Sequence, residues 1–514
     1  MSKVALFRSK TQRYPVEAPF HPPETFPELD RAGIHEINAS NEVYRAVRGT
    51  LALLGLDQQN FGTPEWNPLG AYVLRGDKVV IKPNFVLHEF GMQKDAHCLT
   101  THGSILRAVL DYVYLAAGRE GRIVIADAPL QGANFESVVS IAGLRQLQEF
   151  YREKVDCEIG VIDLRQVRAL IDEESSLIRR IERLAGDPRG YCEIDLGQSS
   201  RLSELNGDNS RYVVGDYDAA VTNARHRSPH HTYLVSRTVL EADAIICVPK
   251  LKTHSKAGLT VCLKNMVGII GSKDCLPHHR HGKTNQGGDE FPADYPTRWL
   301  LSARTYAFLQ GRAPKAVWRT MRSLAQVLLG AGTPINGNGR GVGSGFFPSG
   351  AWHGNDTIWR VVDDLNRILF FYDEVDQRFS HKQRRGYFAV VDGITAMEGN
   401  GPLRGVPKPC GLILAGNDPL AVDVVSAGLM GFDWQRIRML KGIAASEDSP
   451  RYSQFRGGES AIELHSNDPH WTSMESFRKD HLAFQPAAGW RGFVERKQCG
   501  EKDSTTGCPY SSRT

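Results

Sequence analysis

The sequence lacks the signatures of several large protein classes. It has no C-x-x-C pair, so no iron-sulfur cluster motif or zinc ribbon is present. No apolar run reaches the roughly 18 residues of a membrane span, and the N-terminal segment lacks the apolar stretch of a signal peptide. Charge of one sign is missing too, since 62 Lys and Arg face 58 Asp and Glu. We therefore expect no nucleic-acid or membrane partner and a cytoplasmic location.

Short motifs of well-known sites are also missing. Neither the phosphate-binding pattern G-x-x-x-x-G-K-[ST] nor the zinc protease pattern H-E-x-x-H occurs. The nine cysteines are scattered, and an odd number of them fits a reducing compartment. With 514 residues, 41% hydrophobic and 23% charged, the chain is an ordinary globular protein of one large domain or of two to three domains.

Short apolar runs alternate with helical patterns along most of the chain. A helix is expected after the candidate cap Asn41, and another over 104–117. Six runs are predicted strands: Lys78–Ile81, Arg122–Ala126, Gly160–Leu164, Ala244–Val248, Tyr387–Val391 and Leu412–Ala415. This alternation predicts an α/β fold with a doubly wound, mainly parallel sheet.

A capping insertion interrupts the alternation between about 274 and 385. It contains a basic helical stretch near 315–329, a glycine-rich loop at 336–345 and a helix that begins at Asn355 or Asp356. The predicted organisation is an N-terminal arm and helix (1–70), a first part of the core (71–273), the insertion (274–385), a return to the core (386–445) and a loosely ordered tail (446–514).

Polar residues follow the predicted strands at their carboxyl ends, where open parallel sheets bind ligands. Ala244–Val248 leads into the lysine-rich segment PKLKTHSKAGLTVCLKN. Asp, Asn, Pro and Gly at strand ends also serve as turn formers, but Lys82 and Lys250 do not. A solvated basic loop is the alternative interpretation, and the interleaved glycine and apolar residues argue against it.

Five spaced blocks resemble one protein family. They are IKPNF at 81–85, VPKLKTH at 248–254, T-x-x-x-KN at 260–265, VDGI-x-x-MEG-x-GP at 391–402 and GNDPLAVDVV at 416–425. Together they are similar to the family catalogued as domain of unknown function 362, over about 76–440. The resemblance implies little about activity, because the family is defined by sequence. Some relatives carry a fused ferredoxin module, which implies a redox role for them, but this chain lacks its clustered cysteines.

Lysines and small polar residues near the strand ends are candidates for holding an anion. A helix over 256–268 would align Lys256, Thr260 and Lys264 at i+4 spacing, with Gly268 one turn further. Ammonium groups, a hydroxyl and close approach at a glycine suit a phosphate or a carboxylate. A purely structural role is the alternative. The predicted substrate-binding residues are Lys82, Asn84, Lys252, Thr260, Lys264 and Asn265.

His254 is the candidate proton carrier of the predicted catalytic set. An imidazole titrates near neutral pH, and the flanking lysines would keep this ring neutral. Asp392 and Glu398 complete the set and are predicted to orient the substrate or a metal. A structural histidine is the alternative reading of His254.

A divalent metal is the only candidate cofactor. Oxygen donors suit magnesium or manganese, and added imidazoles suit zinc or iron. The predicted ligands are Asp127, His278 and Asp423, although Asp423 would equally well stabilise a helix N-terminus. The insertion offers a second set for substrate or metal recognition: His278, His279, Asp289, Glu290, His353 and Asp356.

These residues predict an enzyme that binds an anionic small molecule, phosphate- or carboxylate-bearing, at the carboxyl ends of the strands, with or without a metal. A non-catalytic ligand-binding or regulatory protein is one alternative. A redox accessory protein, as the ferredoxin-fused relatives imply, is another. The reaction class, the substrate and the oligomeric state stay open.

Overall fold

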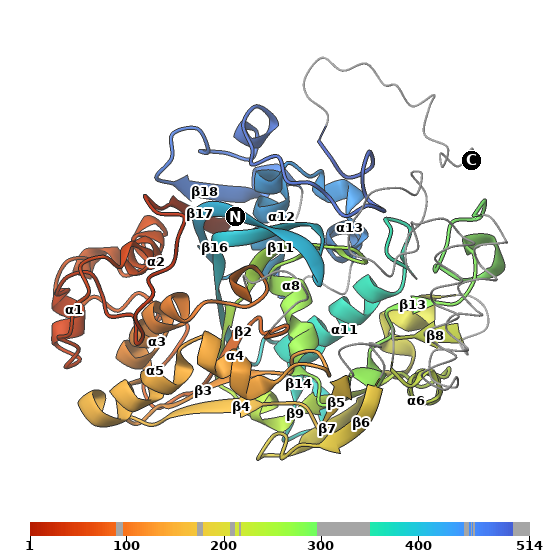
Figure 1. Ribbon diagram of the computed structural model, residues 1–514, viewed down its shortest axis with the longest axis horizontal. Coiled ribbons are helices and arrows are strands. Elements are labelled where there is room, and N and C mark those ends of the chain that lie inside the picture. Colours follow the sequence, from red (N-terminus) through yellow and green to blue (C-terminus); the bar gives the residue numbers. More distant parts are fainter. Residues whose placement is uncertain are drawn as a thin grey trace.

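A ten-stranded sheet runs through the middle of the molecule (Figure 1). The computed structural model describes residues 1–88, 96–171, 178–205, 211–214, 217–295, 350–446, 452–453, 455 and 458–496. Eight strands follow one another across the sheet: β18 (Ile462–Ser466), β1 (Ser2–Arg8), β17 (Arg404–Gly416), β16 (Gly386–Asn400), β10 (Ala244–Val248), β2 (Lys78–Pro83), β3 (Arg122–Asp127) and β4 (Ile159–Asp163). Two short strands, β11 (Lys250–His254) and β12 (Gly258–Thr260), extend it beside β16.

Five of the six predicted strands lie in the parallel half of the sheet, and the sixth, Leu412–Ala415, lies in β17, which pairs antiparallel with β16. Strands β16, β10, β2, β3 and β4 are paired in parallel, and α3 (Gly103–Ala117) connects β2 to β3. The predicted α/β fold with a mainly parallel sheet is thus confirmed. Strands β16 and β17 are longer than predicted, because their antiparallel pairing continues up to Asn400 and Arg404, the last pair before the hairpin turn.

The other edge of the sheet is built from β1, near the N-terminus, and β18, in the C-terminal part of the described residues. Strand β1 pairs antiparallel with β17 and parallel with β18. The prediction of an extended arm at the N-terminus and of a loose tail after 446 therefore differs from the structure, in which each segment supplies a strand. Partners more than 400 residues apart, such as Val4 and Gly416, leave no local sequence pattern that would reveal this pairing.

Alternation along the strands divides the core into two halves. Val79 and Ile81 pack with the helices on one face, whereas Val80 packs on the other, as the two-residue period of a strand requires. One face is covered by α2 (Glu42–Leu53), α3, α4 (Phe135–Ile141) and α5 (Leu144–Phe150). The opposite face is covered by α8 (Cys262–Asn265), α11 (Ile358–Phe371), α12 (Pro419–Met430) and α13 (Arg438–Ala445). As predicted, Asn41 caps α2, because its Oδ1 accepts a hydrogen bond from the Tyr44 amide at 3.1 Å.

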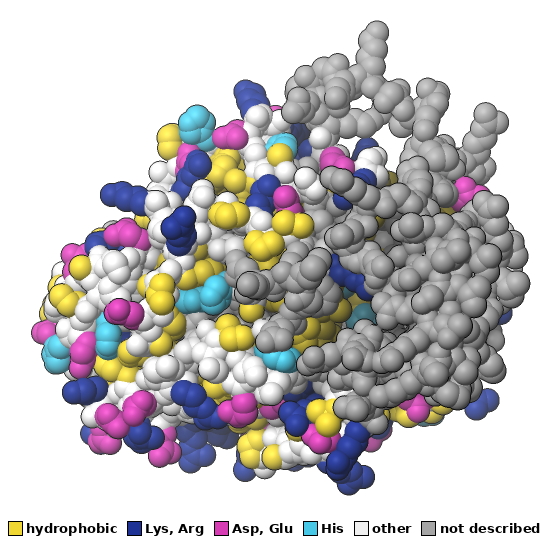
Figure 2. All heavy atoms as spheres, viewed as in Figure 1, with side chains coloured by type: hydrophobic (Ala, Val, Ile, Leu, Met, Phe, Trp, Pro, Cys, Tyr) yellow, Lys and Arg dark blue, Asp and Glu magenta, His cyan; other side chains and the backbone are white. Residues whose placement is uncertain are grey.

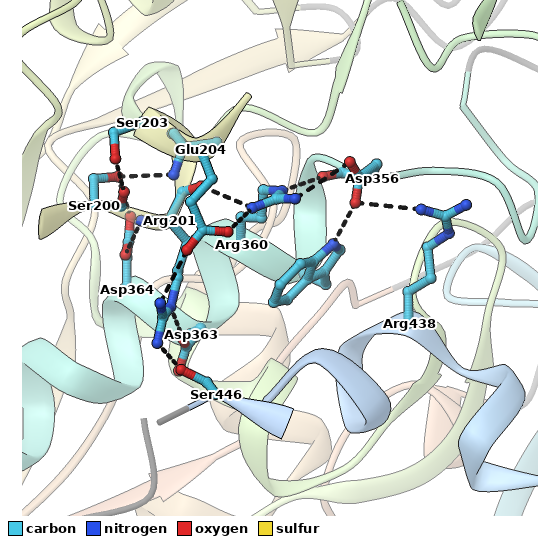
Figure 3. A network of polar contacts seen from close by, with 12 residues as sticks. Ser200, Arg201, Ser203, Glu204, Asp356, Arg360, Asp363, Asp364, Arg438 and Ser446 are labelled. Atoms are coloured by element: carbon cyan, nitrogen blue, oxygen red, sulfur yellow. Dashed lines mark hydrogen bonds and ion pairs between the residues drawn. The ribbon is translucent and has the colours of Figure 1, made fainter. Parts of the chain in front are cut away.

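The predicted insertion is part of the core as well as a cover. Helix α11 packs against α8 and α13 and starts two residues after Asp356, because the Asn355 Oδ1 accepts the amides of Thr357 and Ile358 at 3.1 and 3.2 Å. A network of ion pairs ties α11 to the 3₁₀ helix Arg201–Glu204 and to α13 (Figure 3). The predicted helical stretch 315–329 and loop 336–345 lie outside the described residues.

Small two-stranded sheets and short helices complete the described structure. The strand pairs are β5 (Val167–Ile171) with β6 (Ile178–Arg183), β7 (Tyr191–Asp195) with β9 (Thr232–Ser236), β8 (Tyr212–Val213) with β13 (His279–Arg280) and β14 (Tyr372–Asp373) with β15 (Arg378–Phe379). The short helices are α1 (Pro27–Asp30), α6 (Ala219–Arg225) and α7 (Arg237–Leu240). Among the described residues, no helix combines the length and the apolar character needed to cross a bilayer.

Candidate functional site

The lysine-rich segment after β10 forms a buried strand instead of an exposed loop. After Pro249 the chain continues as β11, in which all five residues are buried. Lys250, Lys252 and His254 alternate with apolar or small residues and so lie on one face of the strand. Strand β11 pairs in parallel with β16 and antiparallel with β12. The helix over 256–268 that would align Lys256, Thr260 and Lys264 does not form, because 258–260 belong to a strand and α8 spans only Cys262–Asn265.

Lys82 is neutralised by Asp127 at the ends of the neighbouring strands β2 and β3. The Lys82 Nζ lies 2.6 Å from the Asp127 Oδ1 and donates to the Pro83 carbonyl at 2.8 Å. The second carboxylate oxygen accepts the Phe85 amide at 2.6 Å. A Cβ at Gly268 would lie 2.0 Å from the Asp127 Oδ1, so this pair requires glycine there. Both charges are buried and satisfied.

Lys250 is neutralised in the same way by Asp392 on β16. Its Nζ lies 2.9 Å from the Asp392 Oδ2 and 2.5 Å from the Tyr14 hydroxyl. That hydroxyl donates to the Asp392 Oδ1 at 2.6 Å, and the amide of His102 donates to Oδ2 at 3.0 Å. The predicted catalytic residue Asp392 is thus the centre of a closed, buried cluster.

Within the described residues, three further lysines are buried without a carboxylate partner. The Lys252 Nζ donates to the Leu99 carbonyl at 3.0 Å, and the Lys273 Nζ donates to the Val267 carbonyl at 3.0 Å. Burial lowers the pKa of each to about 7. Burial also lowers the pKa of Lys264 to about 8. The ammonium of Lys264 has no hydrogen bond or ion pair among the described residues, although the side chain is only 7% exposed.

Lys264 lies at the centre of this group. Its charge is among the causes that lower the pKa of four neighbours: Lys252, His254, Lys273 and His278. Side chains from β11, α8 and the segment 273–278 therefore share one basic environment. We call Lys252, His254, Lys264, Lys273 and His278 the basic cluster.

His254 is held neutral within the basic cluster. Burial and the charges of Lys264 and Lys252 hold its pKa well below the usual value. The Nδ1 accepts hydrogen bonds from the amides of Lys256 and Ala257 at 3.1 and 3.2 Å. Since Nδ1 is an acceptor, the proton of the neutral ring sits on Nε2.

Two buried oxygens beside these lysines have no hydrogen-bond partner in the part of the chain that the structure describes. They are the Thr260 Oγ1 and the Asn84 Oδ1. Thr260 lies opposite Lys252 in the β11–β12 pair. The Asn84 Nδ2 donates to the Asn265 Oδ1 at 3.1 Å, and the Asn265 Nδ2 donates to the Lys82 carbonyl at 3.1 Å. Buried polar groups normally find partners, so these two atoms mark a place where one is missing.

Two predicted acidic residues are engaged in other interactions. Glu398 lies on the β16–β17 hairpin, 2.9 Å from the Lys408 Nζ. Asp423 accepts the amides of Cys262 and Leu263 at 2.7 and 3.2 Å, so it stabilises the start of α8. Burial raises the pKa of Asp423 to about 8.

The predicted metal ligands do not gather as one set of donors. Asp127 pairs with Lys82, Asp423 lies at α8, and the His278 ring contacts the Leu276 carbonyl at 2.6 Å. Among the described residues, the group of donors close enough to share an ion is His279, His281 and Glu290. Sequence reasoning also missed Lys273 and Tyr14, because neither lies in a pattern that sets it apart.

Neither sign of charge dominates the described residues on the face of the molecule drawn in Figure 2. On the face drawn in Figure 2, acidic and basic side chains are interspersed over the described residues.

The fold and the basic cluster define an α/β protein with uncompensated cations at the carboxyl ends of parallel strands. The family model "Domain of unknown function (DUF362)" matches residues 79–163 and 196–428, well over half of the chain, and the protein belongs to this family. No curated protein matches it.

Proposed function

We propose that the protein binds an anionic small molecule, bearing a phosphate or a carboxylate, in the basic cluster and acts on it as an enzyme. The observation that carries this proposal is the Lys264 ammonium, which is buried and has no partner among the described residues. A buried unpaired cation is costly to a fold, and a bound anion would remove that cost.

The ion pairs of the neighbouring carboxylates favour an anion over a metal ion as the ligand of the basic cluster. The nearby carboxylates of Asp127 and Asp392 are already bound by Lys82 and Lys250. No described carboxylate forms an ion pair with Lys252, Lys264 or Lys273, so the local charge is positive. Ammonium groups bind phosphate and carboxylate oxygens through charge-assisted hydrogen bonds.

His254 is the proposed proton carrier of this enzyme. Its ring is neutral beside Lys264, so it has the state of a general base or of a donor through Nε2. A non-catalytic binding protein would use the same lysines and have no use for this ring. Turnover of a bound anion that survives His254→Ala would therefore remove His254 from the mechanism.

A thermal-shift screen tests the binding proposal. Inorganic phosphate, pyrophosphate and citrate at constant ionic strength should raise the melting temperature, since a ligand at about 100 times its Kd adds about 2.7 kcal/mol of stability. The matched variants are Lys264→Met and Lys441→Met, because Lys441 is an exposed lysine on α13. We expect Lys264→Met to lose the shift and Lys441→Met to keep it. Equal shifts in both variants, or none in the native protein, contradict the proposal.

The cysteines bear on where the protein works. Six cysteines of the described residues are buried and free: Cys157, Cys192, Cys247, Cys262, Cys275 and Cys410. Buried free thiols persist in reducing compartments, which supports the cytoplasm as the proposed location.

A further inference from the structure

Two histidines and a glutamate lie together beside the basic cluster. One ligand atom from each of His279, His281 and Glu290 lies within 4.8 Å of the other two. Two imidazoles and one carboxylate are a donor set typical of zinc and of non-haem iron sites.

Strand β13 and the residue that follows it place the rings of His279 and His281 near each other, with centroids 6.0 Å apart. His279 pairs with Val213 across the β8–β13 sheet, and the His281 amide donates to the Arg211 carbonyl at 2.9 Å. Residues i and i+2 of an extended segment point the same way. The pattern H-x-H at 279–281 therefore acts as a local signal for paired imidazoles.

A tight fold-back brings Glu290 to the two rings. The Glu290 amide donates to the carbonyls of Arg280 and Gly282 at 3.1 and 3.2 Å. Gly282 has a φ of +99°, and a Cβ at Gly288 would lie 2.4 Å from the carbonyl oxygens of His281 and Gly282. Both glycines are thus required by the fold-back. The Glu290 Oε2 is held 3.1 Å from the Gly282 amide and 3.2 Å from the His281 Nδ1.

The ring of His279 has one nitrogen that lacks a partner. The side chain is 1% exposed, its Nδ1 lies 3.1 Å from the Lys256 Nζ, and its Nε2 is buried with no hydrogen bond. A buried nitrogen without a partner is unfavourable. Nε2 is therefore the atom of this ring that is available to a metal ion.

The His281 ring makes this group of three donors accessible to solvent. His281 is exposed, whereas His279 and Glu290 are buried. A surface hollow lined by Arg211, His281, Gly282 and Gln286 lies next to it. Three protein ligands with an open side leave room for water or for a bound molecule, as in catalytic rather than structural metal sites.

We propose that His279, His281 and Glu290 bind one divalent transition metal ion of the zinc or iron(II) type. The site would lie next to the basic cluster, because His279 follows His278 in the chain and contacts Lys256. It goes beyond the anion proposal and stands without it, since none of its three ligands belongs to the basic cluster.

Metal titration of the full-length protein tests this site. After treatment with a chelator, the protein is titrated with Zn²⁺ against a chromophoric competitor, and with Co²⁺ while the visible spectrum is recorded. We expect one tight equivalent of either ion and a Co²⁺ spectrum typical of nitrogen and oxygen ligands. A thousandfold excess of Mg²⁺ should not displace Zn²⁺, because magnesium prefers oxygen ligands.

Substitutions decide whether these residues hold the metal. His281→Ala and Glu290→Gln should each weaken Zn²⁺ binding by more than about 100-fold, which exceeds the loss caused by outer partners of ligands. His281 is exposed, so its variant should fold, and a thermal melt verifies this. The control is His230→Ala, an exposed histidine 2.5 Å from Asp195, which should bind as the native protein does. No tight equivalent, or unchanged affinity in His281→Ala, overturns the proposal.

Discussion

Two groups of charged side chains in this protein differ in whether their charges are balanced. The network between Arg201–Glu204 and α11 is closed: Arg201 pairs with Glu204 and Asp363, and Arg360 with Glu204 and Asp356 (Figure 3). The basic cluster has cations that no described carboxylate balances. The difference teaches where to look for function, because folding alone favours paired charges and an unpaired one points to a ligand.

The largest expected effect comes from opening the closed network. Asp363 is buried and accepts hydrogen bonds from the Arg201 Nε at 2.7 Å and from the Tyr452 hydroxyl at 2.9 Å. Asp363→Ala leaves Arg201 without its buried partner, which should lower the free energy of unfolding by about 3 kcal/mol. Urea denaturation measures this. A loss below about 1 kcal/mol would mean that the network is not a structural element.

The opposite sign is expected in the basic cluster. Lys264→Met removes a buried cation that has no partner in the described structure. Without added anion it should raise the free energy of unfolding by about 1 to 3 kcal/mol, because the penalty for burying the charge disappears. Lys441→Met, at an exposed position, should change it by less than about 0.5 kcal/mol. Destabilisation by Lys264→Met would assign Lys264 to the fold instead of to a ligand.

A pH titration sharpens the comparison, because the unpaired lysines titrate near neutrality. The pKa is lowered to about 7 in Lys252 and to about 8 in Lys264. Both are protonated at pH 6 and largely neutral at pH 9, so affinity for an anion should fall as the pH rises across this window. Sulfate keeps a constant charge there, and calorimetry should show a loss of about tenfold or more, as expected for one lost charge-assisted hydrogen bond.

The same titration in the absence of anion has a defined sign. The folded pKa of Lys252 lies below the ordinary lysine value of about 10.4, so the unfolded chain binds more protons between about pH 7 and 10. The contribution of this lysine to stability therefore becomes more favourable as the pH rises through that window. The pKa of Lys264 is lowered too, so Lys264→Met should reduce the pH dependence of the free energy of unfolding.

For the titration with anion, a sulfate affinity that does not change between pH 6 and pH 9 would contradict the proposed role of both lysines.

The smallest effect is expected at Glu398. Its partner Lys408 is partly exposed, and the pair lies on the hairpin. Glu398→Ala should cost about 1 kcal/mol or less and leave the anion-induced rise in melting temperature unchanged. If Glu398→Ala abolished that rise, Glu398 would belong to the anion-binding site, as predicted from the sequence.

Most of the parallel half of the fold could be predicted from the sequence. The run Ala244–Val248 has the bounds of β10, because a buried strand of a parallel sheet is apolar throughout. Strands β1 and β18 could not be predicted, since each is stabilised by pairing with distant segments. The i+4 spacing over 256–268 does not become a helix for a related reason. Residues 258–260 pair with β11 as strand β12, and tertiary contacts override local helical spacing.

Most residues of the candidate site could be predicted, with the exception of Lys273, but their roles could not. Lys82, Lys250, Lys252 and Lys264 look alike in the sequence, and only the fold brings Asp127 to the first and Asp392 to the second. Charge pairing across strands depends on register, which the sequence does not encode locally. His279 and Glu290 were both predicted for substrate or metal recognition, whereas His281 was not. The fold-back at Gly282 and Gly288 brings Glu290 to the two rings.

A crystal structure of the protein soaked with selenate tests the central claim most directly. Anomalous scattering locates the selenium, and we predict a selenate oxygen within about 3 Å of the Lys264 Nζ, with Lys252 or His254 as a second contact. A Lys264 ammonium that is ion-paired to a carboxylate of the chain, with no selenate beside it, would contradict the account.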